Sequence, residues 1–422
     1  MRAVLFGIWP LLLGILFIML GNGMHFTLIG LRGDIEGFTT GQLAFVTSSY
    51  FIGFLLGARI SPRMIRRVGH VRVFAALGSF MSAGLITFPL IAEPWAWTLL
   101  RLLVGFCMSG IYVTAESWLN EASTNESRGK VLSAYMICQT LGVIGAQGLL
   151  SLGDAATATL FIGASILVSI SFAPILLTMV RAPAVEVAPP MSMRELFASS
   201  PLSTVGIFLA GSIYASQAGM AVVFGSQIEL SAPQIALLVA TFFAGALALQ
   251  FPIGILSDRI GRRKLILTSS VLGGLACVAG ALAGEHYGLL LAAAFFSGGV
   301  TSPLYALFLA YTNDYLPHEA MPAASGGLVF TFGLGAIVGP LVTGWAMQLF
   351  SPSAYWWALA GTFLAIVLYA MYRSTQRPDV PVDEAEPYLS TVVPAASPVA
   401  VEAAGVWASE QADEEEGNEE SP

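Results

Sequence analysis

Five residues in the first half of the sequence have the types and the spacing to handle a proton. They recur at intervals of four, three, four and four residues, which places them on one stripe of an α-helix: Arg101, Gly105, Met108, Tyr112 and Glu116. A carboxylate can take up and release a proton, and a guanidinium can set its surroundings or hold an anionic group. The flanking sequence is strongly apolar, and ionisable side chains in such helices mark functional sites. We therefore expect Glu116 to exchange the proton and Arg101 to act with it.

These residues also have structural interpretations. Glu116 could lie among lipid headgroups and pair with a loop arginine, and Arg101 could snorkel to the interface or make a structural bond within its helix. His25, three residues after Asn22, could exchange a proton near neutral pH or simply join two helices. Further polar side chains could line a cavity or bridge helices: Tyr112, Gln139, Gln147, Tyr214, Gln217, Gln250, Tyr305 and Tyr311.

The composition indicates that lipid surrounds the helices that carry these residues. Of the 422 residues 56% are apolar and only 10% are charged, with a mean hydropathy of +0.77, whereas soluble domains carry about 25% charged residues. A bilayer core needs about 20 helical residues. Runs of that kind predict an all-α membrane protein with twelve transmembrane helices, near 8–30, 41–60, 73–92, 95–116, 131–152, 157–180, 202–225, 234–256, 265–284, 287–310, 323–348 and 352–373.

The sequence repeats itself at an offset of 192 or 193 residues. Features that return include Asn22/Tyr214, His25/Gln217, Glu36/Glu229, Gly105/Gly298, Tyr112/Tyr305 and Gly142/Gly335. We expect two pseudo-symmetric six-helix halves, residues 1–180 and 202–375, joined by a cytoplasmic loop at 181–201. Parallel repeats of this kind place a binding site between the halves, near the bilayer midplane.

The two copies of the repeat differ in the charge of their side chains. The second-half residues that correspond to the Arg101–Glu116 stripe are uncharged: Ala294, Gly298, Thr301, Tyr305 and Leu309. This difference predicts that the first half handles protons.

The basic residues orient the chain. With the N-terminus in the cytoplasm and the helices alternating, 16 of the 18 Lys and Arg residues fall on the cytoplasmic side, as the positive-inside rule requires. We expect a multi-pass protein of the cell inner membrane with both termini cytoplasmic. The net charge of −8 comes from residues 376–422, which hold twelve of the 26 acidic residues. That tail is expected to be disordered, either as a solvated end or as a docking segment.

The sequence lacks the motifs that mark several other classes of protein. Neither Lys130 nor Lys264 lies in a Walker sequence, and the His-Glu pair at 318–319 has Pro322 where a zinc site needs its second histidine. The three cysteines lie in apolar runs without metal-site spacing. We expect no enzyme activity, no cofactor, no metal ion and no nucleic-acid partner, which leaves an ion gradient or facilitated diffusion to drive transport.

One loop combines glycines and charges in a specific pattern, Gly254-x-x-x-Asp258-Arg259-x-Gly261-Arg262-Arg263. This pattern resembles the loop signature of the major facilitator superfamily. Arg101-x-x-x-Gly105 and Glu121-x6-Arg128-Gly129 also resemble motifs of that family, and the chain is most similar to its YcaD-like branch over residues 5–375. A Gly-Pro motif at Gly339-Pro340 resembles that of the antiporters but belongs to helix eleven instead of helix five.

The resemblance implies the major facilitator fold and transport by alternating access, with the loop residues stabilising one access state. The first-half loop departs from the pattern. It keeps Arg66, Arg67 and Gly69 but has Ser61, Pro62 and Arg63 where the family places an acid. Its arginines are expected to pair instead with acids on neighbouring loops: Glu121, Asp314 or Glu319.

The function expected from these observations is secondary active transport of a small solute, coupled to protons, by a monomer in the lipid bilayer. One alternative is an efflux pump for amphipathic or drug-like compounds, which would need a cavity rich in Phe and Met. The other is a transporter-like sensor that signals through its acidic tail.

Overall fold

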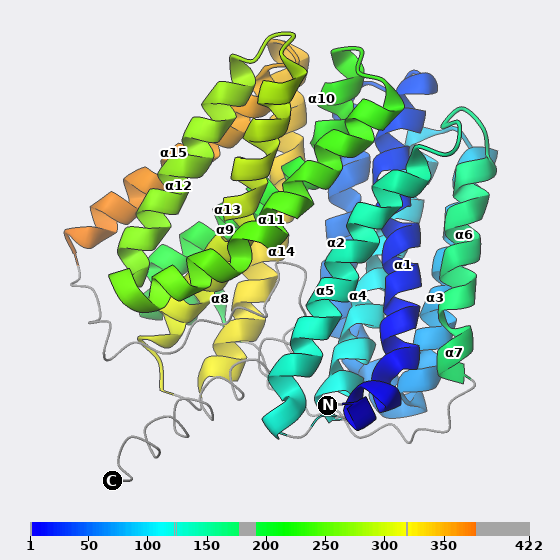
Figure 1. Ribbon diagram of the computed structural model, residues 1–422, viewed down its shortest axis with the longest axis horizontal. Helices are drawn as coiled ribbons and strands as arrows, with labels where there is room; N and C mark the ends of the chain where they lie inside the picture. The colour runs from blue at the N-terminus through cyan, green and yellow to red at the C-terminus, as the bar shows by residue number, and fades with distance from the viewer. Residues whose placement is uncertain (1, 122, 124, 177–190, 318–319, 377–422) are drawn as a thin grey trace.

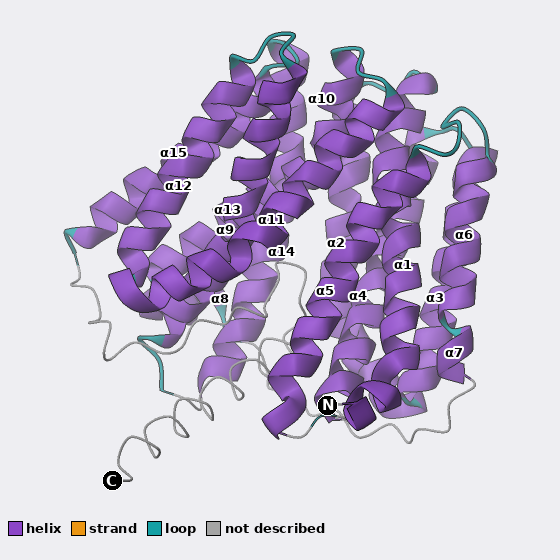
Figure 2. Ribbon diagram, in the orientation of Figure 1, coloured by secondary structure: helices purple, strands orange, loops and turns teal. Residues whose placement is uncertain are grey.

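The computed structural model describes residues 2–121, 123, 125–176, 191–317 and 320–376 (Figure 1). Throughout these ranges the regular elements are helices (Figure 2), and twelve segments are long and apolar enough to cross a membrane. The predicted fold class is confirmed. The twelve segments also match the twelve predicted apolar runs in order, and most extend a few residues beyond them.

The first half contains six spans. Thr39 and Gln42 cap the start of the second span through reciprocal side-chain to backbone hydrogen bonds of 3.3 and 2.8 Å. Gly69, with φ of 86°, separates the second and third spans. The helices are α1 (Arg2–Ile35), α2 (Thr40–Val68), α3 (His70–Thr87), η1 (Phe88–Leu90), α4 (Pro94–Glu121), α5 (Asn125–Leu150), α6 (Thr159–Ser171) and α7 (Ala173–Leu176).

The second half repeats this order. Its first span is continuous through α9, η2 and α10, and η2 is a π-helical turn in the middle of the span. The helices are α8 (Met193–Ser199), α9 (Pro201–Ala215), η2 (Ser216–Met220), α10 (Ala221–Gln227), α11 (Ala232–Ile260), α12 (Arg262–Ala281), α13 (Tyr287–Asn313), α14 (Met321–Leu349) and α15 (Ala354–Ser374).

The region predicted as a loop at 181–201 contains helix α8, which the search for long apolar runs did not find. Ser192 and Glu195 form its capping box, with the Ser192 backbone N–H donating to Glu195 Oε2 at 2.9 Å. The segment before this helix contacts α14: the Met191 N–H donates to the Ala323 carbonyl at 2.7 Å. Most of the remaining linker, and the acidic tail beyond residue 376, lie outside the described residues.

Matching glycines let helices pack backbone to backbone in both halves. A Cβ added to Gly53 would lie 1.9 Å from the Leu102 carbonyl oxygen, and one added to Gly245 would lie 2.0 Å from that of Phe295. These contacts join α2 to α4 and α11 to α13, and their residues are separated by 192 and 193 positions. Gly105 and Gly298 make the reciprocal contacts. The sequence repeat is therefore also a repeat of helix packing.

The two halves meet closely at the end of the molecule where α10 lies, uppermost in Figure 1. A Cβ on Gly344 would lie 2.5 Å from the Cβ of Ala44, so α14 and α2 touch directly. Two hydrogen bonds cross the same interface: Ser226 donates to Asp34 at 2.6 Å, and Gln227 donates to Thr40 at 2.7 Å. We call this set of contacts the α10-end seal.

Candidate functional site

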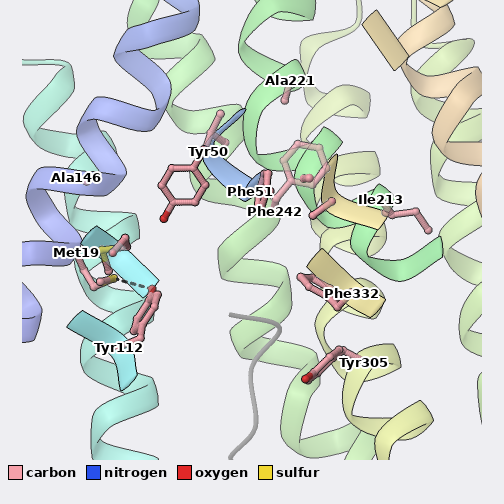
Figure 3. Close-up of a cluster of buried hydrophobic side chains, with 14 of the residues drawn as sticks. Met19, Tyr50, Phe51, Tyr112, Ala146, Ile213, Ala221, Phe242, Tyr305 and Phe332 are labelled. Atoms are coloured by element: carbon pink, nitrogen blue, oxygen red, sulfur yellow. Dashed lines mark hydrogen bonds between the residues drawn. The ribbon is translucent and has the colours of Figure 1, made fainter. Parts of the chain in front are cut away.

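A cavity of about 80 Å³ lies between the two halves. Residues of α1, α2, α4 and α5 form one wall, and residues of the α9–η2 span, α11 and α14 form the other. Figure 3 shows Met19, Tyr50 and Tyr112 on the first-half side and Phe332 on the opposite side. Aromatic rings form much of the wall: Phe26, Tyr50, Phe51, Phe54, Tyr112, Tyr214, Phe243 and Phe332.

The polar groups of the wall belong mainly to the first half. The Gln147 carbonyl accepts from the Thr27 hydroxyl at 2.9 Å, and its amide donates to the Gly23 carbonyl at 3.3 Å, so both ends of this side chain are engaged. Asn22 is only 8% exposed, and its Oδ1 has no hydrogen-bond partner among the described residues. Three of the candidate residues lie in this wall: Asn22, Tyr112 and Gln147.

Arg101 lies directly behind the aromatic wall. Its guanidinium carbon is 4.2 Å from the centre of the Phe26 ring and 4.6 Å from that of Tyr50, and the side chain is 1% exposed. Its Nη1 lies 3.4 Å from Nδ1 of His25, which acts as acceptor because a guanidinium can only donate. His25 packs edge-on against Phe88, with ring centres 4.5 Å apart. The guanidinium therefore points into the protein, not toward the interface.

Glu116 is fully buried on the same helix, well away from Arg101. The Tyr135 hydroxyl of α5 donates to its Oε1 at 2.9 Å. Fifteen residues separate the two charged side chains, which corresponds to about 22 Å along the axis at 1.5 Å per residue. The stripe recognised in the sequence thus places its two charges at different depths, and the structure does not bring them together. Arg101 accordingly has no direct contact through which to set the surroundings of Glu116.

The second-half counterparts have a different environment. Gln217 borders a smaller space with Tyr214 and Thr301, and its Nε2 has no partner in the described part of the chain. Tyr305 is fully buried outside the main cavity wall, and its ring packs edge-on against Phe332 at 5.2 Å. Of the predicted site residues, these two are adjacent to the cavity but not in its wall.

The charged loops differ between the halves. Gly69 and Gly261 both adopt positive φ, 86° and 82°, where each loop turns. After Gly261, Arg262 forms an ion pair with Asp314 and donates to the Ala310 carbonyl at 3.1 Å. Arg263 donates to the Tyr311 hydroxyl at 2.7 Å. The second-half loop is therefore fastened to the end of α13.

The expected pairing of the first-half arginines with Glu121, Asp314 or Glu319 stays a prediction. Arg66 and Arg67 are exposed, and Asp314 is bound by Arg262 of its own half. Arg259 is also exposed, and Gly254 is buried in α11. Other predicted loop residues lie where the side chains are outside the described part of the structure: Glu121, Arg128, Asp258 and Glu319.

The contact of Arg101 with the Phe26 and Tyr50 rings was not predicted from the sequence. Phe26 follows His25 directly, and Tyr50 and Phe54 are four residues apart on α2, a spacing that places them on one helix face. That spacing was a usable signal for an aromatic wall. The pairing of these rings with Arg101 depends on how α1, α2 and α4 pack, which no local pattern specifies.

Comparisons with known proteins agree with this architecture. The sequence profile of the Major Facilitator Superfamily matches residues 11–224 and 202–408, once for each half. The uncharacterized MFS-type transporter YfkF of Bacillus subtilis is 26% identical, over 82% of this chain and 95% of its own. The uncharacterized MFS-type transporter YcaD of Escherichia fergusonii is 25% identical, over 88% and 97%.

Two solved structures have the same fold. The nucleoside transporter NupG superimposes with a TM-score of 0.72 at 15% identity, covering 87% of this chain and 99% of that one. A bacterial homolog of the human lysosomal transporter Spinster, in an inward-facing and occupied conformation, gives 0.66 at 16% identity, covering 87% and 95%. Together with the two profile matches and the twelve spans, these results show that the chain belongs to the Major Facilitator Superfamily of membrane transporters.

Proposed function

We propose that the protein is a secondary transporter that binds a small solute in the cavity between its halves and moves it by alternating access. The observation that carries this proposal is the combination of a shared cavity with the α10-end seal. A cavity whose walls belong to two separate bundles can open at either end when the bundles rock against each other. The seal closes one of those ends.

The basic residues suggest which side the seal faces. With 16 of 18 Lys and Arg residues in the cytoplasm, the α10 end lies on the outer side of the inner membrane. In this proposal the structure is closed to the outside, and both chain termini are cytoplasmic. The protein works as a monomer because a single chain supplies both walls of the cavity.

Glu116 is the proposed proton carrier. An ionised carboxylate withdrawn from water is costly unless hydrogen bonds or a counter-charge compensate for it. Glu116 is fully buried on the helix that contributes Tyr112 to the cavity wall, and it accepts from Tyr135. A proton taken up at Glu116 would remove the charge and change the relative stability of the two access states. Arg101 acts separately, by holding the Phe26 and Tyr50 rings in the wall.

Export of amphipathic compounds is the second candidate function. The observation in its favour is the ring of eight aromatic side chains around the cavity, because apolar and aromatic walls bind the apolar part of such molecules. The nucleoside transporter NupG, whose fold is similar, is named for substrates that contain rings. Both candidates require the same alternation of access.

A crosslink across the seal tests alternating access without a known substrate. Asp34 and Ser226 are replaced by cysteine, and Ala218, a cavity residue 8% exposed, becomes a cysteine reporter. The native thiols Cys107, Cys138 and Cys277 are replaced by alanine. We expect a short bifunctional reagent to join 34 and 226, and then to abolish labelling of the reporter from the outside by an impermeant thiol reagent.

Labelling from the cytoplasmic side should continue after the crosslink. An uncrosslinked sample and a reporter-only variant serve as controls. Equal labelling from the outside with and without the crosslink would show that the seal does not gate the cavity.

A further inference from the structure

We propose that the cavity selects an uncharged, ring-containing molecule that donates a hydrogen bond to Asn22, and that it rejects cations. This inference concerns the substrate class and rests on the proposed transport function. Three features of the described residues carry it: a wall without ionic side chains, a buried guanidinium behind that wall, and an unused acceptor within it.

The first feature is the chemistry of the cavity wall. None of the lining residues that the structure describes is Asp, Glu, Lys, Arg or His. A charged molecule that enters such a space loses its water shell and finds no counter-ion, which is strongly unfavourable. A neutral molecule avoids that cost and can use the aromatic surface for binding.

The second feature, the buried guanidinium of Arg101, determines which sign of charge the cavity disfavours. Among the described residues, the contacts of Arg101 are the two rings and His25, and the ion pairs are made by other residues, Arg32 with Glu36 and Arg262 with Asp314. The positive charge of Arg101 therefore acts on the cavity through two rings that form part of the wall. A cation beside Phe26 and Tyr50 would be repelled, because the guanidinium already uses the cation–π attraction of these two rings. This part of the wall is therefore unsuited to cationic amphiphiles.

The third feature fixes the orientation of the ligand. Asn22 Oδ1 is a buried acceptor without a partner in the described part of the chain, whereas Gln147 is already engaged at both ends. Buried acceptors are costly until a donor reaches them. The opposite wall is apolar at Val239, Val329 and Phe332. The ligand should place its N–H or O–H toward α1 and its ring toward the second half.

A matched series of three probes tests the charge rule. The compounds 4-phenylbenzamide, 4-phenylbenzamidine and 4-phenylbenzoate share one shape and are neutral, cationic and anionic at pH 7. Their dissociation constants are measured on the purified full chain in detergent by microscale thermophoresis and by thermal shift. We expect the neutral amide to bind at least about tenfold more tightly than the amidine, a difference that corresponds to 1.4 kcal/mol. Amidine binding as tight as amide binding would overturn the proposal.

Variants of Asn22 test the hydrogen bond and the sign together. Asn22→Ala should weaken amide binding roughly three- to tenfold, as for the loss of one hydrogen bond. Asn22→Asp adds a negative charge to the wall and should reverse the preference, so that the amidine binds better than the amide. The matched control is Asn313→Ala, since Asn313 is another buried asparagine with an unpartnered Oδ1 but lies outside the cavity wall. Its binding constants should equal those of the wild type.

The outcomes separate this inference from the transport proposal. If Asn22→Ala and Asn313→Ala weaken amide binding equally, Asn22 is only structural and the inference fails, while the crosslinking result still decides whether access alternates. If the crosslink leaves outside labelling unchanged but the probes follow the charge rule, the cavity is a binding site and the transport mechanism is wrong. A preference for the benzoate would overturn the proposal, because it would show that attraction to Arg101 outweighs the cost of placing a charge in a wall without counter-ions.

Discussion

The two six-helix halves share their helix packing but differ in their buried chemistry. Gly53 and Gly245 make equivalent backbone contacts, and Gly69 and Gly261 turn equivalent loops. Yet Arg101 and Glu116 of α4 are buried charges, and the equivalent positions of α13 are Ala294 and Leu309. The helix-packing contacts are therefore repeated in both bundles, whereas the ionisable side chains at these two positions of the repeat occur in the first bundle alone.

The loops show the opposite asymmetry. The second-half loop is held by the buried Arg262–Asp314 ion pair and by Arg263 on Tyr311, whereas Arg66 and Arg67 of the first-half loop are exposed. At the position after the turn glycine, the first half has His70 and the second half has Arg262. The two loops thus differ in how their basic side chains are placed: Arg262 and Arg263 make buried contacts with α13 or its end, whereas Arg66 and Arg67 are exposed.

The packing side of the comparison predicts a large effect in both halves. Gly53→Ala and Gly245→Ala each place a Cβ about 2 Å from a backbone carbonyl oxygen, so each should destabilise its half by at least about 3 kcal/mol through overpacking. Gly148→Ala is the control because no atom lies within 4 Å of its added Cβ. Thermal unfolding in detergent measures all three. A large effect in only one half would break the structural equivalence.

The loop asymmetry predicts the next effect. Arg262→Ala removes one member of a buried ion pair and should cost about 3–5 kcal/mol. Arg66→Ala removes an exposed charge and should change the free energy of unfolding by less than about 0.5 kcal/mol. Unfolding of the two variants under identical conditions gives the comparison. Equal losses would mean that the first-half loop is fastened as firmly as the second.

The smallest effect concerns two capping boxes that differ in charge. Hydrogen bonds from the Ser192 hydroxyl and backbone N–H lower the pKa of Glu195, so the start of α8 is stabilised above that pKa and loosens as the pH falls through it. The box at Ser231 and Gln234, which starts α11, has no ionisable group. Hydrogen exchange, corrected for its intrinsic pH dependence, should show acid loosening at α8 and none at α11. The same acid response at both boxes would contradict this assignment.

The sequence was sufficient for the fold because the bilayer restricts the choices. Each apolar run must form a helix, and the offset of 192 or 193 residues relates the halves. Helix α8 was missed because it is short, although its Ser-x-x-Glu start is a local signal. The π-helical turn at Ser216–Met220 has no comparable signature.

The candidate site was only partly predictable. Helical periodicity predicts that Arg101, Tyr112 and Glu116 share one stripe of a helix, but their burial and contacts could follow only from the packing of neighbouring helices. The rings on Arg101 come from α1 and α2, and the hydroxyl on Glu116 comes from α5. Asp314 pairs with Arg262 because α12 and α13 are neighbours in the second half.

The central claim, that a proton on Glu116 of the first half selects the access state, is tested most directly by the pH dependence of cavity access. The rate at which an impermeant thiol reagent labels the Ala218→Cys reporter from outside is measured across the pH range in oriented vesicles. Each rate is divided by the rate of the same reagent with a free thiol at that pH, because the thiolate is the reacting form. In the protein that keeps Glu116, the labelling rate should change with pH. Glu116→Gln, which resembles the protonated acid, should give a pH-independent rate equal to the acidic limit of that curve. A Glu116→Gln curve that follows the wild-type curve would contradict the claim.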